Sequence, residues 1–172
     1  ILFEAKKRFN EHLQKNNLDP NLRSVVYNLV AYDSDEKTFE ILKKMYLKEK
    51  MQEEKMRLLG SLCSFKQKDI LKKVLEFSLT KNVRSQDAYA VASIIAGNEY
   101  AGDLAWEFVK NNWNKYYKMY GEGHHMAVLI KSVLSRYKSL DKIKEINQFF
   151  KTHKAPTAKR AIEQSIEMIR IN

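Results

Sequence analysis

Residues 104–113 read LAWEFVKNNW, and the large side chains of this stretch recur at the spacing of one helix face. The same face continues toward Gly121 and carries these residues: Trp106, Val109, Trp113, Tyr117 and Tyr120. An α-helix brings residues three or four positions apart to one side. The pattern therefore predicts one long helix that buries both tryptophans and ends at Gly121, with Tyr116 and the interleaved lysines off the buried face.

The rest of the chain repeats this helical spacing. Apolar positions three to four apart mark further faces at Leu22/Val25/Val26/Leu29/Val30, Phe39/Leu42/Met45/Tyr46, Leu58/Leu59/Leu62/Cys63, Ile70/Leu71/Val74/Leu75, Ala88/Val91/Ala92/Ile95, Met126/Leu129/Ile130/Val133/Leu134, Leu140/Ile143/Ile146/Phe150 and Ala158/Ile162/Ile166/Ile169. No segment alternates with a period of two, which excludes a β-rich fold. Short connections favour antiparallel neighbours.

The fold expected is therefore all-α, with about nine or ten helices in antiparallel pairs. Helix pairs recur at roughly 30 to 37 residues, which is typical of a short α-solenoid of the HEAT or armadillo kind. Residues 1–172 are expected to form a single helical domain. Asp19 with Pro20, Ser34 and Pro156 stand where helices should begin.

The composition is strongly basic: 31 Lys and Arg stand against 21 Asp and Glu, for a formal charge of +10. Such a charge can indicate a nucleic-acid or membrane partner. Here the lysines are spread along every predicted helix, which favours a solvated surface. We expect no membrane partner and no specific nucleic-acid partner, so that any binding to DNA or RNA is weak and lost in moderate salt.

No self-contained active site is evident. The four histidines are His12, His124, His125 and His153, and none has a second histidine one turn away, as a zinc-binding helix requires. Paired carboxylates at Glu53/Glu54 and Asp33/Asp35 are expected at solvated positions. Cys63, the single cysteine, is expected to be a buried apolar residue. We predict no catalytic residues, no metal ligands and no cofactor in this chain.

Several short motifs occur in a characteristic order. They are EEKMRLLGSL at 53–62, LKKVLEFSL at 71–79, NVRSQD at 82–87, LAWEFVKNNW at 104–113, FFKTH at 149–153 and AKRAIEQ at 158–164. Together they resemble the C-terminal helical domain of the zinc aminopeptidases that include the puromycin-sensitive and endoplasmic-reticulum enzymes and the tricorn-interacting factors. The pattern is closest to the puromycin-sensitive branch. The zinc signature of that family, His-Glu-x-x-His, does not occur in these 172 residues.

The resemblance implies a non-catalytic domain that covers the active site of the enzyme and encloses the distal part of a peptide substrate. Its partners would be peptides and the catalytic domain of the same polypeptide, which would hold the zinc ion. The chain would be the last part of the C-terminal domain of a larger, cytoplasmic aminopeptidase. Its start, which reads as the inside of an amphipathic helix, also suggests a piece of a longer protein. The alternative is a free-standing helical-repeat scaffold that binds protein or nucleic acid.

Four residues are candidates for peptide binding: Arg84, Gln86, Lys66 and Lys68. Arg84 and Gln86 belong to the VRSQD motif, where Arg could hold a peptide carboxylate with two parallel hydrogen bonds. The alternative is a purely structural helix start, with Ser85 as the cap, Asp87 at the positive end of the helix and Arg84 paired with a nearby acid. Endoplasmic-reticulum members carry an Arg that is implicated in holding the peptide C-terminus, whereas this chain has Ser64 there. Lys66 and Lys68 are the nearby cations, without the planar geometry of Arg.

Overall fold

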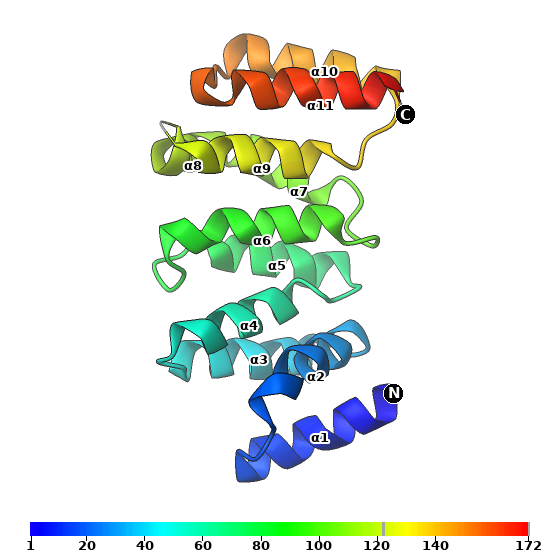
Figure 1. Ribbon diagram of the computed structural model, residues 1–172, viewed down its shortest axis with the longest axis vertical. Coiled ribbons are helices and arrows are strands. Elements are labelled where there is room, and N and C mark those ends of the chain that lie inside the picture. Colours follow the sequence, from blue (N-terminus) through cyan, green and yellow to red (C-terminus); the bar gives the residue numbers. More distant parts are fainter. Residues whose placement is uncertain (122, 172) are drawn as a thin grey trace. The chain divides into compact units, whose positions relative to one another are not determined.

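The computed structural model describes residues 1–121 and 123–171, and every regular element in that part of the chain is a helix (Figure 1). The prediction of an all-α, helical-repeat fold is confirmed. The chain divides into two compact units, Ile1–Asn82 and Val83–Asn172. Whether residues 1–172 act as a single domain stays a prediction. No helix in the described residues combines the length and apolar character that crossing a membrane requires.

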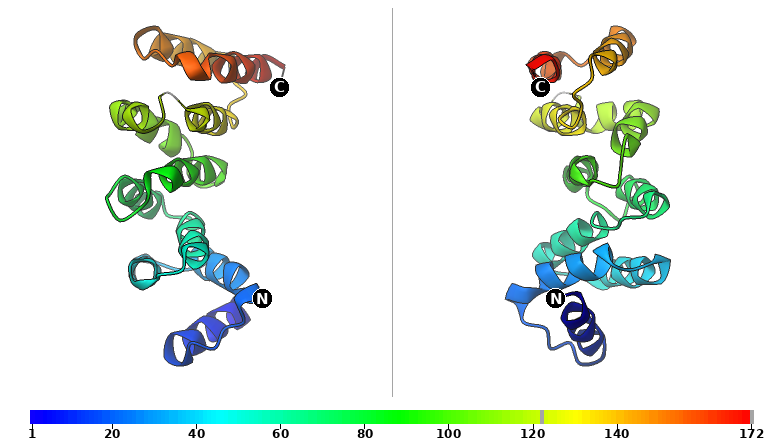
Figure 2. Two further views of the ribbon diagram at one scale, coloured as in Figure 1. Left: turned by 60° about the vertical axis from the view of Figure 1, so that its left-hand side comes forward. Right: turned by 90° about the vertical axis from the view of Figure 1, so that its right-hand side faces the viewer.

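The first unit is built from α1 (Leu2–Lys15), α2 (Pro20–Tyr32), α3 (Glu36–Lys48), α4 (Gln52–Leu62) and α5 (Lys68–Ser78). Within it α2 packs against both α1 and α4, and α3 packs against α4 (Figure 2). As predicted, Pro20 is the first residue of α2, and the Asp19 side chain caps it by accepting the Asn21 amide at 2.8 Å. The prediction that Ser34 begins the next helix is wrong by one residue. The residue that caps α3 is Asp35, whose side chain accepts hydrogen bonds from the amides of Lys37 and Thr38.

The buried face of α2 differs from the predicted one. Val26 and Val30 are buried as expected, but Val25 is exposed, as is Leu22 to a smaller degree. The face is turned so that Tyr27, which is fully buried, takes their place. A tyrosine can lie there because its hydroxyl has partners on α1 and α4.

Cys63 is buried as predicted, and burial raises the pKa of its thiol to about 12. The prediction that Glu54 is solvated is wrong, because this residue is only 4 % exposed. It is stabilised in the interior by charged and polar donors on its own helix and on α2.

The second unit is built from α6 (Ser85–Gly97), α7 (Leu104–Asn111), α8 (Trp113–Tyr120), α9 (His124–Leu134), α10 (Leu140–Thr152), a 3₁₀ turn η1 (Pro156–Ala158) and α11 (Lys159–Ile171). Within it α6 packs against α7 and α9, and α11 packs against α9 and α10. Figure 1 shows α10 and α11 joined by a short connection at one end, so they run in opposite directions. Pro156 begins the 3₁₀ turn that leads directly into α11, close to the predicted helix start.

The long helix predicted over Trp106 to Tyr120 is interrupted at Asn112. This residue leaves the helical conformation, with φ −114° and ψ 21°, and its side-chain amide donates to the Phe108 carbonyl at 3.0 Å. The buried face nevertheless continues from α7 into α8 at steps of three and four residues, through Trp106, Val109, Trp113, Tyr116 and Tyr120. Tyr116, predicted to lie off this face, is fully buried, whereas Tyr117, predicted to be buried, is 40 % exposed.

The two tryptophans pack against the FFKTH motif, as part of the interior of the second unit. Both Trp106 and Trp113 meet the Phe149 ring edge-on with centroids 5.2 Å apart, and Trp113 also contacts Phe150. Edge-to-face contacts of this kind add stability beyond the burial of area. Two motifs that are about 40 residues apart in sequence therefore fix α7 and α8 against α10.

Glu145 on α10 joins the same helices by polar contacts. Its carboxylate accepts the Trp106 indole N–H at 2.8 Å and the ammonium group of Lys110 at 2.7 Å. Lys142 donates to the other oxygen at 2.8 Å. Burial opposes the charge of Glu145, but these donors outweigh it and lower its pKa to about 2.

Two neighbouring tyrosines of α8 differ in burial and are expected to differ in their contribution to stability. Tyr116→Ala should lower the free energy of unfolding by about 3 kcal/mol or more, because it empties a fully buried site. Tyr117→Ala, the matched control, should cost about 1 kcal/mol or less. Urea unfolding followed by far-ultraviolet dichroism measures both. A larger loss for Tyr117 than for Tyr116 would contradict the buried face described for α8.

Candidate functional site

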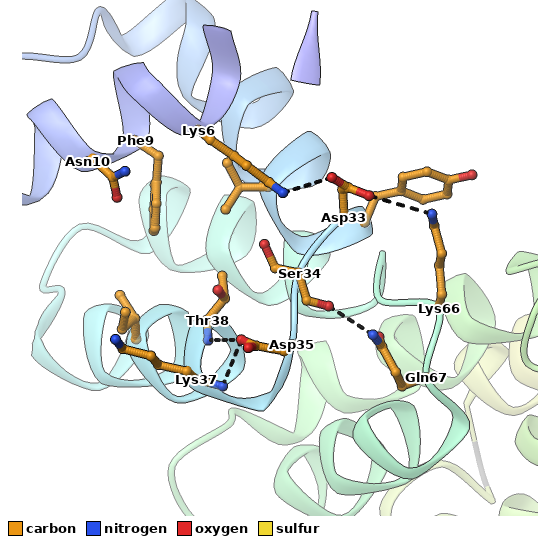
Figure 3. A pocket seen from close by; sticks show the side chains of 13 residues that line it. Lys6, Phe9, Asn10, Asp33, Ser34, Asp35, Lys37, Thr38, Lys66 and Gln67 are labelled. Atoms are coloured by element: carbon orange, nitrogen blue, oxygen red, sulfur yellow. Dashed lines mark hydrogen bonds and ion pairs between the residues drawn. The ribbon is translucent and has the colours of Figure 1, made fainter. Parts of the chain in front are cut away.

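A hollow of about 690 Å³ opens in the first unit between α1, the α2–α3 connection and the α4–α5 connection (Figure 3). Its lining is mostly polar and comprises Lys6, Phe9, Asn10, Val30, Tyr32, Asp33, Ser34, Asp35, Lys37, Thr38, Ile41, Lys66 and Gln67. One of the four predicted peptide-binding residues, Lys66, is in this lining. The hollow is therefore the candidate functional site of the first unit.

Asp33 lies at the centre of the charged part of the hollow. Its carboxylate accepts a hydrogen bond from the Lys6 ammonium group at 2.7 Å, and the Lys66 nitrogen lies 3.9 Å from the other oxygen. The bond from Lys6 holds the pKa of Asp33 below its usual range. The Lys66 nitrogen also lies 3.9 Å from the centre of the Tyr32 ring. Three segments of the chain are thus joined around one carboxylate.

The α2–α3 connection forms one wall of the hollow and is held at two further points. Asp35 caps α3, and the side-chain amide of Gln67 donates to the Ser34 carbonyl at 2.9 Å (Figure 3). A binding surface built on a fixed connection loses little conformational entropy when a ligand binds. Lys37, at the start of α3, is exposed and adds a third cation to the lining.

The other predicted residues lie outside this hollow. Lys68 is the first residue of α5, where it is exposed and does not line the hollow. Arg84 and Gln86 belong to the second unit, at the start of α6. The structure therefore brings Lys66 together with Lys6 and Asp33, neither of which was among the predicted peptide-binding residues.

At the start of α6, Arg84 is paired with the acid on the next turn. Its guanidinium donates to Asp87 from Nε at 2.8 Å and from Nη2 at 3.2 Å. Asp87 is buried, whereas the Arg84 side chain is 48 % exposed and Gln86 is exposed. The predicted pairing of Arg84 with an acid is confirmed, and part of its surface stays open to solvent.

The prediction that Ser85 caps α6 is wrong, because the helix begins at Ser85 and no side chain caps it. The backbone there is held by Tyr120, whose hydroxyl donates to the Ser85 carbonyl and accepts the Tyr89 amide at 3.2 Å. Burial raises the pKa of Tyr120 to about 12, so its hydroxyl keeps the proton that it donates. Tyr120 is 35 residues later in the sequence, so the pattern around Ser85 alone does not predict this contact.

Within residues 1–121 and 123–171, no three His, Cys, Asp or Glu side chains lie together in a way that could hold a metal ion. His124 and His125 are at the start of α9, with ring centroids 4.0 Å apart and ring planes tilted by 35°. His153 lies flat against Phe149, also at 4.0 Å. These three histidines contribute ring contacts in the second unit.

Comparison with known proteins gives a match over nearly the whole chain. Residues 1–171 match the family described as the ERAP1-like C-terminal domain. The chain is 35 % identical to Aminopeptidase M1 of Arabidopsis thaliana, over 99 % of the chain and 20 % of that protein. It is 30 % identical to Aminopeptidase N of Mus musculus, over 100 % of the chain and 18 % of that protein. It is 26 % identical to Aminopeptidase Ey of Gallus gallus, over 96 % of the chain and 18 % of that protein. The chain spans about a fifth of the length of these curated relatives.

The start of α6 allows a test of the structural part played by Arg84. Arg84→Ala removes an ion pair from the buried Asp87 and should lower the free energy of unfolding by about 1 kcal/mol, since the half-exposed Arg84 is partly screened by solvent. Gln86→Ala, two residues away, is the control and should change it by less than about 0.5 kcal/mol. Chemical denaturation provides both values. Equal effects of the two substitutions would contradict the role of the ion pair.

Proposed function

The chain belongs to the ERAP1-like C-terminal domain family, and we propose that it is a non-catalytic C-terminal domain of a zinc aminopeptidase. In that enzyme it would cover the active site and enclose the distal part of peptide substrates. The observation that carries the proposal is the match over residues 1–171, which corresponds to about a fifth of relatives that are named aminopeptidases. The rest of such a protein is large enough to hold a catalytic domain.

The residues of this chain do not fit a zinc site, since the part that the structure describes has no group of three potential ligands. The zinc ion would be bound by the catalytic domain of the same polypeptide, which is the proposed partner. The role that we propose for residues 1–172 is substrate contact, without a chemical step. The proposal includes a cytoplasmic location and the lack of a specific nucleic-acid or membrane partner, which stay predictions.

The hollow around Asp33 has the chemistry to contact a peptide. Its cations Lys6, Lys37 and Lys66 face two carboxylates, so one positive charge is in excess. Ammonium groups donate to the carbonyl oxygens and carboxylates of peptides, and the side chains of Asn10 and Thr38 add polar groups to the same lining. Such contacts suit many sequences and select for length and charge more than for particular side chains.

Arg84 is the corresponding candidate in the second unit. Its bonds to Asp87 hold the guanidinium in place, and nearly half of the side chain is open to solvent. A guanidinium fixed in this way is suited to a peptide carboxylate or carbonyl. Arg84 can thus stabilise the start of α6 and bind substrate at the same time, and the two roles are separable by measurement.

Deletion of residues 1–172 from the full-length protein tests the proposal. Cleavage of peptides of about ten residues should fall at least about tenfold, because long substrates use distal contacts to reach a productive geometry. Cleavage of a single aminoacyl-coumarin, which needs only the zinc pocket, should fall much less. The measurement is kcat/KM for both substrates. Equal kcat/KM values before and after the deletion, for both substrates, would contradict a role in peptide handling.

Point variants then locate the contacts in an intact protein. Lys37→Ala and Arg84→Ala should each raise KM for the long peptide about threefold to tenfold and leave the aminoacyl-coumarin rate unchanged. Lys44→Ala, an exposed lysine on the same helix as Lys37, is the matched control. If Arg84→Ala lowers stability and leaves the ratio of the two activities unchanged, Arg84 only supports the start of α6.

A further inference from the structure

A buried histidine lies at the junction of α1 and α2, away from the proposed peptide contacts. His12 is 6 % exposed on the inner face of α1. Its Nδ1 lies 3.2 Å from the backbone nitrogen of Leu18, and its Nε2 lies 3.0 Å from the Tyr27 hydroxyl. Both ring nitrogens are therefore engaged, one with the α1–α2 connection and the other with α2.

The hydrogen bonds around His12 can run in only one direction. The Leu18 amide can only donate, so Nδ1 must be the acceptor and carries no proton. The single proton of the neutral ring is then on Nε2 and is donated to Tyr27. Tyr27 in turn donates to Glu54 at 3.0 Å. A continuous chain of donors thus leads from the Leu18 backbone, through His12 and Tyr27, to a buried carboxylate.

The charges around this chain fix its protonation state. On α2, Arg23 lies 3.4 Å from Glu54 and also donates to the Leu18 carbonyl at 3.1 Å. On α4, Arg57 donates to Glu54 at 2.9 Å. Burial opposes the charge of Glu54, but the bonds from Arg57 and Tyr27 outweigh it and lower its pKa. The carboxylate is therefore ionised, and Tyr27 keeps the proton that it donates.

Titratable and charged groups lie around the ring on three helices. Helix α2 contributes Arg23 and Tyr27, and helix α4 contributes Glu53, Glu54 and Arg57. On α1 itself, His12 is flanked by Arg8, Glu11 and Lys15. Burial and then Arg23 lower the pKa of His12 from 6.5, against the opposing effect of Glu54. A second proton on the ring would be on Nδ1, where it meets the N–H of Leu18. Two donors facing each other cannot form a hydrogen bond, so protonation must separate the ring from the α1–α2 connection.

We propose that His12 is an acid-sensitive latch, which holds α1 and residues 16–19 against α2 and α4 at neutral pH and releases them when the ring takes up a proton. Leu18 is the point of release, because its amide is held by His12 and its carbonyl by Arg23. Helix α1 contributes Lys6, Phe9 and Asn10 to the hollow around Asp33. Release of α1 therefore removes one wall of that hollow. The latch does not depend on the proposed function.

The sign of the pH dependence follows from the two states of His12. In the released state the ring has its ordinary pKa of 6.5, whereas its pKa in the folded state is lower. Each release therefore takes up a proton below pH 6.5, so the latch is complete above that pH and weakens as the pH falls. If the folded ring stays neutral throughout, the equilibrium for release rises by at most about 30-fold from pH 7.5 to 5.0.

Hydrogen–deuterium exchange of the chain at pH 7.5 and 5.0, corrected for intrinsic rates, tests the latch. Protection in peptides that cover α1 and residues 16–19 should fall severalfold and up to about 30-fold, while α5 changes little. His12→Gln should abolish this difference, because its amide can still donate to Tyr27 but does not titrate. His124→Gln, which changes an exposed histidine on α9, is the matched control and should retain it.

Two outcomes would overturn the latch: equal protection of α1 at the two pH values, or a full pH effect in His12→Gln. The NMR signals of the His12 ring in the unaltered chain provide a measurement that does not depend on how the variant folds. They should show a proton on Nε2 alone at pH 7.5 and a pKa below 6.5. A proton on Nδ1 at neutral pH would also overturn the proposal.

Discussion

A carboxylate that is shielded from water must be met by donors, and each unit of this chain has a carboxylate that binds donors from more than one helix. In the first unit it is Glu54, which binds Tyr27 and Arg23 of α2 and Arg57 of its own helix. In the second it is the partly exposed Glu145, which joins α10 to α7 through Trp106 and Lys110. Helices that share such a carboxylate cannot slide past one another without breaking its hydrogen bonds, so these contacts fix their register.

Apolar packing supplies most of the stability around these two carboxylates. Which apolar side chains are buried there depends on the hydrogen bonds that the carboxylates accept. Tyr27 is in the interior because Glu54 and His12 satisfy its hydroxyl, and this turns the face of α2 away from Leu22 and Val25. Trp106 can lie next to α10 because its indole N–H has a charged acceptor. In both units a polar contact selects which of the possible apolar faces is buried.

The helical period was enough to predict the fold class, most helices and the burial of Cys63, Trp106 and Trp113, because these depend on local spacing. It failed where a partner is far away in the sequence. The burial of Glu54 depends on Tyr27, 27 residues earlier, and the support of Ser85 depends on Tyr120, 35 residues later. Of the residues that line the hollow, Lys66 was predicted to bind peptide, and that role stays a prediction. Its meeting with Lys6 and Asp33 could not be predicted, because three separate segments bring these residues together.

The interruption at Asn112 has a consequence for how relatives of this chain are aligned. The joint between α7 and α8 is a single residue, and each of these helices has only eight residues, too few to be stable alone. One inserted residue would rotate α8 by about 100° and turn Tyr116 toward solvent. The separation of the two tryptophans is therefore a fixed length, and an alignment that opens a gap between them pairs residues that are not structurally equivalent.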